Sequence, residues 1–144
     1  MRKGRSPGLV LYFDGASRGN PGPAAYGVWS PSGIARSETL GTTTNNVAEW
    51  RGFLAALDAA LESGASDVEI RADSELVLRQ FSGEYRVKAA HLEAYRDEAR
   101  EKARKLPGLR VTHVPREKNH EADALANRAL DAAAARARAA RKPA

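Results

Sequence analysis

Residues 9–15 read Leu9-Val10-Leu11-Tyr12-Phe13-Asp14-Gly15, in which five consecutive apolar residues end in a carboxylate. An apolar run this short predicts a central strand that is buried on both faces. The segment Ser17–Pro23 that follows is rich in Gly and Pro and predicts a long turn. A carboxylate beside a core is costly unless a cation or hydrogen bonds compensate its charge. Asp14 is therefore either a metal-binding or catalytic group, or only the start of the turn.

The composition favours one domain that binds nucleic acid. The chain has 144 residues and a formal net charge of +5, which favours an acidic partner. The absence of cysteine excludes disulfides, thiolate metal sites and a cysteine nucleophile. The apolar run behind the basic N-terminus is shorter than the roughly 7–15 residues of a signal-peptide core. No stretch is long enough to cross a membrane, so we expect a cytoplasmic protein without a membrane partner.

Patterns along the chain predict alternating strands and helices. The expected strands are 9–14, 24–29, 34–40, 68–73 and 109–114, and the expected helices are 47–61, 74–81, 91–105 and one from about 120. The first half reads as a hairpin or meander, whereas strands alternating with helices in the second half imply parallel crossovers. The predicted class is therefore α/β with a partly parallel sheet. The Ala/Arg-rich tract after residue 131 either extends the last helix or frays.

Three more acids stand at junctions between expected elements, as Asp14 does. Glu49 lies in the first turn of the first helix, Asp73 ends the fourth strand, and Asp123 lies in the first turn of the last helix. Each has a purely structural alternative. Glu49 fits a capping box with Asn46 as the cap. Asp73 fits a helix cap, and Asp123 is favourable for the helix dipole.

Together, the four acids predict a metal site. Asp14 and Asp73 end what should be neighbouring parallel strands, and ligands of α/β sheets sit at such strand ends. Four converging carboxylates repel each other unless divalent cations are bound. Oxygen ligands without cysteine favour Mg²⁺ or Mn²⁺ over Zn²⁺. In a basic protein, this set indicates phosphodiester hydrolysis with two metal ions.

The same residues belong to motifs that resemble, in order, those of the type 1 ribonuclease H family. The four matching segments are Asp14–Gly27, Thr43–Glu49, Ala72–Ser74 and His113–Asn127. The resemblance runs from about residue 10 to residue 130, nearly the whole chain. It implies a ribonuclease H-like fold, in which a five-stranded mixed sheet is flanked by helices on both faces. It also implies endonucleolytic cleavage of the RNA strand of RNA–DNA hybrids, giving 5′-phosphate and 3′-hydroxyl ends.

Residue by residue, the resemblance implies three groups of functional side chains. The catalytic, metal-binding acids, with Mg²⁺ or with Mn²⁺ in its place, are Asp14, Glu49, Asp73 and Asp123. The substrate contacts are Asn20, Asn45 and Asn46 to the RNA strand, and Thr44 to a phosphate of the DNA strand. The auxiliary candidates near the mobile loop are His113, Arg116, Glu117 and His120. The RNA contacts are chemically reasonable, because amides can read the 2′-OH that distinguishes RNA from DNA.

Three departures from the family pattern affect these expectations. Residues 83–88 are brief where many bacterial members carry a basic, tryptophan-bearing protrusion, so a compact form is expected. Thr42 and Ala89 replace an Arg and an Asn that often complete the phosphate pocket. The catalytic histidine of many members falls at about Arg116 or Glu117 here. The two auxiliary histidines therefore either swing into the site or have no role in it.

We expect three segments and a monomer that binds an RNA–DNA hybrid duplex. The segments are a basic N-terminal extension (1–8), the ribonuclease H domain (9–131) and an Ala/Arg-rich basic C-terminal tail (132–144). One alternative is a non-catalytic hybrid-binding module, whose signature would be a lost acid, but all four acids are present. Another is a different nuclease on the same fold, such as a 3′–5′ exonuclease. Those enzymes usually have a second acid two residues after the first, where this chain has Ala16.

Overall fold

The computed structural model describes residues 8–141. The elements are β1 (Leu9–Ser17), β2 (Gly22–Trp29), β3 (Ala35–Thr43), α1 (Asn45–Ser63), β4 (Val68–Ala72), α2 (Glu75–Ser82), α3 (Ala90–Arg104), β5 (Leu109–His113), the 3-10 turn η1 (Arg116–Lys118) and α4 (His120–Arg141). This order of strands and helices is the one that the sequence predicts. The basic residues Arg2, Lys3, Arg5 and Lys142 lie outside the described residues.

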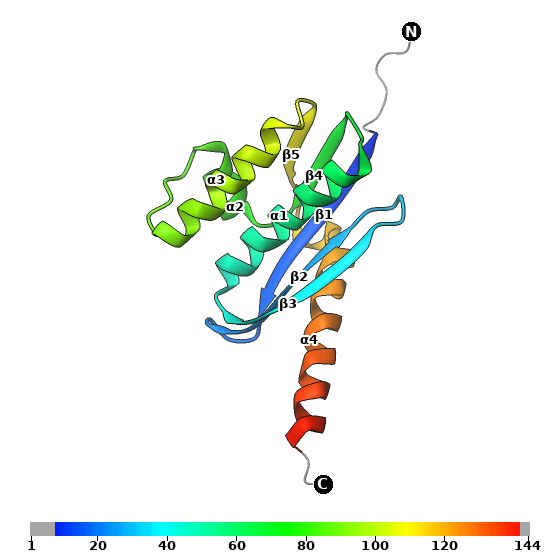
Figure 1. Cartoon of the computed structure of the whole chain (residues 1–144), viewed down its shortest axis with the longest axis vertical. Coiled ribbons are helices and arrows are strands. Elements are labelled where there is room, and N and C mark those ends of the chain that lie inside the picture. Colours follow the sequence, from blue (N-terminus) through cyan, green and yellow to red (C-terminus); the bar gives the residue numbers. More distant parts are fainter. Residues whose placement is uncertain (1–7, 142–144) are drawn as a thin grey trace.

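The strands form one mixed sheet in the order β3-β2-β1-β4-β5 (Figure 1). β1 is antiparallel to β2 and parallel to β4, and β4 is parallel to β5. The chain reaches β4 from the hairpin through α1, and it reaches β5 from β4 through α2 and α3. The predicted α/β class with a five-stranded mixed sheet is confirmed.

Helices cover both faces of the sheet, but unequally. α1 to α3 lie on one side, and α4 packs across β1, β2 and β3 on the other (Figure 1). On the α1 side, Phe13 of β1 is fully buried and stacks on Phe53 with ring centroids 5.3 Å apart. On the α4 side, Tyr12 and Asp14 are only half-buried. The expectation that β1 is buried on both faces is therefore wrong for the α4 side, because α4 covers only one part of this face of the sheet.

The sequence predicted that Asp14 ends its strand, and this prediction is wrong. β1 continues to Ser17, because it stays paired with β2 after its other neighbour β4 has ended at Ala72. Asp14 pairs with Gly27 of β2, so its backbone is held in the sheet. This places Asp14 on a rigid strand at the level where the parallel half of the sheet ends.

Two further features bear on function. Residues 83–89 join α2 to α3 directly, so the compact form expected from the sequence is what the structure shows. α4 continues through the Ala/Arg-rich tract to Arg141 and projects beyond the sheet (Figure 1). None of the helices within residues 8–141 has both the length and the apolar character that a membrane span requires.

Candidate active site

Four acids from four different parts of the fold line one pocket of about 220 Å³. Asp14 belongs to β1, Glu49 to α1 and Asp123 to α4, and Asp73 directly follows β4. The remaining lining residues are Gly15, Ala16, Ser17, Asn45, Arg116 and Asn119. The pocket thus lies beside β1, between the starts of α1 and α4.

Two glycines allow the helices to approach the strands this closely. A Cβ on Gly15 would lie 2.3 Å from the backbone nitrogen of Glu49, so β1 and the first turn of α1 are in backbone contact. A Cβ on Gly27 would lie 2.3 Å from the carbonyl oxygen of Ala122, next to Asp123. Larger side chains would push these helices, and their acids, away from Asp14. Both glycines belong to the first matching motif, but the motif does not show that a helix backbone lies against them.

Neighbouring side chains hold two of the acids. The Ser74 hydroxyl donates a hydrogen bond of 2.7 Å to Oε1 of Glu49. The Asn119 amide donates to Oδ1 of Asp73 over 2.7 Å and to the carbonyl of Phe13 over 2.8 Å. Asn119 therefore joins Asp73 to the central strand.

Asn119 lines the pocket and holds Asp73, although the sequence analysis assigned it only a place within the fourth motif and no role. Its side chain is 1% exposed, and its Oδ1 has no hydrogen-bond partner within the described residues. A cap-type residue directly before a helix was the available signal, but it does not reveal burial. Contacts with β1 and β4 depend on the tertiary fold, so the sequence alone could not show them.

The capping roles proposed as alternatives for Glu49 and Asn46 are wrong. Thr44 is the N-cap of α1, and its Oγ1 accepts a hydrogen bond from the backbone nitrogen of Val47 over 3.2 Å. The helix begins two residues earlier than predicted, so Asn46 already lies within it. Glu49 accepts its hydrogen bond from Ser74 instead.

The alternatives for the other two acids have different outcomes. Ser74, not Asp73, is the N-cap of α2, so the capping role considered for the Asp73 side chain is wrong. Asp73 turns its carboxylate toward Asn119. Asp123 lies in the first turn of α4, as expected, where a negative charge is favourable for the helix dipole. This helix role is compatible with a place in the pocket.

Burial and mutual repulsion make full ionisation of the pocket unfavourable. Burial, the charge of Asp73 and a hydrogen bond with Asp123 raise the pKa of Asp14 to about 9. Burial also raises the pKa of Glu49, although the hydrogen bond from Ser74 acts in the opposite direction. A bound cation would relieve this cost by keeping the carboxylates charged.

The donor set fits a hard divalent cation. All four candidate ligands are carboxylates, the oxygen donors that Mg²⁺ and Mn²⁺ favour. Within residues 8–141, however, no three acidic or histidine side chains are already gathered around one coordination point. The acids share a pocket without forming a closed ligand set. Burial first, and then the charges of Asp73, Asp123 and Glu49, raise the pKa of Asp14, which is the electrostatic cost that a cation in this shared pocket would offset.

Of the four expected substrate residues, Asn45 lines this pocket, and Asn20, Thr44 and Asn46 do not. Asn20, in the loop after β1, accepts a hydrogen bond over 3.0 Å from the backbone nitrogen of Asn45. Asn45 lines the pocket at the start of α1. Asn46 follows it, and its Oδ1 is buried without a hydrogen-bond partner in the described part of the chain. The side chain of Asn45 therefore shares the pocket with the acids, and Asn20 is joined to the backbone of Asn45.

The four auxiliary candidates are placed differently. Arg116 of η1 lines the pocket, with its Nε 3.8 Å from Oδ2 of Asp73 and its side chain 88% exposed. Glu117, the next residue of η1, is exposed and does not line the pocket. His113 ends β5 and His120 starts α4, and both are exposed outside the pocket lining.

Comparisons with known proteins agree with this geometry. The family described as reverse transcriptase-like matches residues 13–129. The ribonuclease HI of Halobacterium salinarum is 48% identical over 125 residues, which make up 83% of this chain and 63% of that protein. The crystal structure of ribonuclease H1 from the same organism has a TM-score of 0.79 at 45% identity and covers 85% of this chain and 97% of that one. This chain belongs to the type 1 ribonuclease H family.

Another solved structure of the ribonuclease H family shares the fold. LC11-RNase H1 in complex with an RNA/DNA hybrid has a TM-score of 0.80 at 39% identity, and the match covers 87% of this chain and 98% of that one. Two of the curated relatives are longer proteins than this chain. The chain spans 63% of the Halobacterium protein and 39% of the bifunctional protein Rv2228c of Mycobacterium tuberculosis, to which it is 44% identical over 142 residues.

Proposed function

We propose that this member of the ribonuclease H family is an endoribonuclease that hydrolyses the RNA strand of RNA–DNA hybrids with Mg²⁺. The observation that carries the proposal is the convergence of four acids, from four parts of the fold, on one pocket. The name of the Halobacterium relative and the hybrid bound by LC11-RNase H1 support it.

The residues that would hold the metal are Asp14, Glu49, Asp73 and Asp123. When bound there, two divalent ions supply activation of the attacking water and charge stabilisation of the leaving 3′ oxygen, which gives 5′-phosphate and 3′-hydroxyl ends. Ser74 and Asn119 would orient the carboxylates of Glu49 and Asp73 through the hydrogen bonds that they donate. Mn²⁺ is expected to substitute for Mg²⁺, because it favours the same ligands.

The amides beside the pocket would select the RNA strand. Asn45 lines the pocket, and its backbone nitrogen donates a hydrogen bond to the side-chain oxygen of Asn20. Their side chains, with the Nδ2 of Asn46, would provide donors and acceptors for 2′-OH groups, which DNA lacks. Thr44 uses its oxygen as an acceptor for the cap, so its hydroxyl hydrogen remains to be donated to a phosphate.

The experiment that tests this function incubates the protein with three end-labelled duplexes: RNA–DNA hybrid, dsRNA and dsDNA. Each duplex is tested with Mg²⁺, with Mn²⁺ and with EDTA. We expect internal cuts in the RNA strand of the hybrid, with either metal and not with EDTA. Hybrid binding without cleavage would instead support a non-catalytic binding module. Cleavage that proceeds only from a strand end would support an exonuclease.

A further inference from the structure

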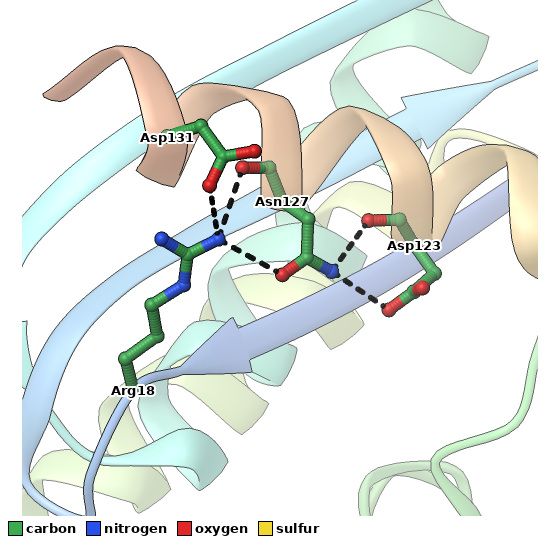
Figure 2. Close-up of polar contacts among 4 residues, drawn as sticks. All are labelled: Arg18, Asp123, Asn127 and Asp131. Atoms are coloured by element: carbon green, nitrogen blue, oxygen red, sulfur yellow. Dashed lines mark hydrogen bonds and ion pairs between the residues drawn. The ribbon is translucent and has the colours of Figure 1, made fainter. Parts of the chain in front are cut away.

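A hydrogen-bond network links the loop after β1 to one side of α4 (Figure 2). The Nη2 of Arg18 lies 2.7 Å from Oδ1 of Asp131 and 3.3 Å from both oxygens of Asn127, in its side chain and its backbone. The Nδ2 of Asn127 donates over 3.1 Å to the carboxylate of Asp123 and over 3.0 Å to its carbonyl. The network therefore connects the loop that carries Asn20 to one of the four acids.

The chemistry of its two partners fixes the orientation of the Asn127 amide. A guanidinium group can only donate hydrogen bonds, and an ionised carboxylate can only accept them. Arg18 must therefore face the oxygen of the amide, which leaves the nitrogen to face Asp123. Both partners therefore favour the same orientation, and Arg18 strengthens the preference that the two acceptor oxygens of Asp123 already set.

Asp123 needs such support because of its place in the fold. The other three acids are held by a paired strand, by the Ser74 hydroxyl and by the Asn119 amide. Asp123 is exposed on the first turn of α4, where its side chain has rotameric freedom. Asn127 lies one turn later on the same helix face, the spacing at which side chains meet.

We infer that Asn127 is a positioning residue for Asp123, and that Arg18 locks the Asn127 amide in the orientation that this role requires. The inference rests on the proposed function, because it takes Asp123 to be a metal ligand. Groups that hold a metal ligand in place typically contribute roughly 10–100-fold in metal affinity or activity. The pair between Arg18 and Asp131 is exposed and adds little to stability. The effect of the network should therefore appear in metal binding rather than in folding.

The test titrates Mn²⁺ into the full chain by calorimetry, without nucleic acid, for the wild type and Asn127→Ala. We expect about tenfold weaker Mn²⁺ binding by Asn127→Ala. The Mg²⁺ concentration for half-maximal hybrid cleavage should rise by the same factor, with KM for the hybrid unchanged. The variant should fold, because alanine has the highest helix propensity. Asn127→Gln, which keeps an amide four residues from Asp123, should recover part of the affinity.

Two arginine variants separate the network from general charge. Arg18→Ala should weaken Mn²⁺ binding in the same direction as Asn127→Ala, but less, because the Asn127 amide is still present. Arg128→Ala removes the same charge from the exposed surface of α4, outside this network, and should leave Mn²⁺ binding unchanged. Wild-type Mn²⁺ affinity in Arg18→Ala, with a raised KM and a weaker salt dependence, would overturn the role given to Arg18. It would then be a phosphate contact.

Asp123→Asn serves as the reference for both proposals. If it loses Mn²⁺ affinity and cleavage while Asn127→Ala binds Mn²⁺ as the wild type does, the positioning role is overturned and the proposed function stands. If Asp123→Asn keeps both properties, the four-acid site of the proposed function fails, and the inference fails with it. Loss in both variants, with recovery by Asn127→Gln, supports the inference.

Discussion

Asp14 carries the largest electrostatic cost in the pocket. Its ordinary pKa of 3.8 is raised to about 9, first by burial and then by the nearby Asp73, Asp123 and Glu49. Between these two values the folded metal-free protein holds a proton that the unfolded chain releases. The stability that this bound proton contributes to the folded state is therefore fully present below about pH 4, and it is lost as the pH rises toward 9.

Asp14→Asn should remove this pH dependence, because an amide does not titrate. We expect the free energy of unfolding in EDTA to fall less steeply between pH 5 and pH 9 than in the wild type. At pH 9 the variant should be the more stable protein. Urea denaturation at several pH values measures this, with Glu101→Gln on the exposed surface of α3 as the control. A variant that is less stable than the wild type at pH 9 would show that Asp14 is not under electrostatic strain.

Thr44 and Asn46 should have separate roles, since only Thr44 caps α1. Thr44→Ala should lower the free energy of unfolding by about 1 kcal/mol, the usual cost of a lost cap, and Thr44→Ser should restore most of it. Asn46→Ala loses no cap, so its main effect should be on cleavage of a hybrid. Urea denaturation and steady-state kinetics on one hybrid measure both effects. A loss of cap energy in Asn46→Ala, with none in Thr44→Ala, would contradict this assignment.

At the scale of whole elements, the spacing of apolar residues was sufficient to predict the type and order of the helices and strands. The apolar spacing along α1 and the apolar run of β1 indicated their type because side-chain burial follows the periods of helix and strand. The boundaries were less predictable. β1 continues past Asp14 because β2 remains paired with it, and α1 starts early because Thr44 takes the cap among several residues that can. Both outcomes depend on partners that are distant in the sequence or on a choice between chemically similar neighbours.

The candidate site shows the same limit. Its four acids were identifiable because each stands at the junction of two predicted elements. The side chains that hydrogen-bond to these acids could not be identified in the same way. Asn119 bonds to Asp73 across 46 positions of sequence, and Arg18 bonds to Asn127 across 109. Contacts of this kind follow from the packing of α4 on the sheet, which no local pattern specifies.

The end of α4 provides a basic surface that projects beyond the sheet (Figure 1). Arg136, Arg138 and Arg141 are exposed there. We predict that they contact phosphates, so that deleting residues 132–144 raises KM for the hybrid while kcat and the metal dependence stay nearly unchanged. Each lost contact should reduce the slope of log Kd against log salt concentration by roughly 0.7–0.9.

A matched triple substitution controls for net charge. Arg36, Arg104 and Arg110 are exposed but each is paired with an acid, so their replacement by Gln removes the same charge from other elements. This control should change the salt slope less than replacing the three arginines of α4 by Gln does. Equal slopes for the truncated and full-length proteins would mean that the tail only aids solubility.

For the whole molecule, the central claim is that one fold gathers four separate acids into a single metal-dependent site. α1 approaches β1 at Gly15 and α4 approaches β2 at Gly27, so the two faces of the sheet each deliver an acid to Asp14. The two close contacts that pack these helices against the sheet therefore also bring the acids together. We expect the formal net charge of +5 to attract an acidic substrate to this site.

The most direct test is the single-turnover rate of hybrid cleavage by Asp73→Asn, with saturating hybrid and Mg²⁺. The substitution keeps the shape of the side chain and an oxygen that accepts from Asn119, but it removes one charge from the proposed metal site. We predict a fall in rate of about 100-fold or more, since a lost charged ligand costs several kcal/mol of transition-state stabilisation. Hybrid affinity in EDTA should be unchanged or higher. A folded Asp73→Asn protein that cleaves the hybrid at nearly the wild-type rate would contradict the account.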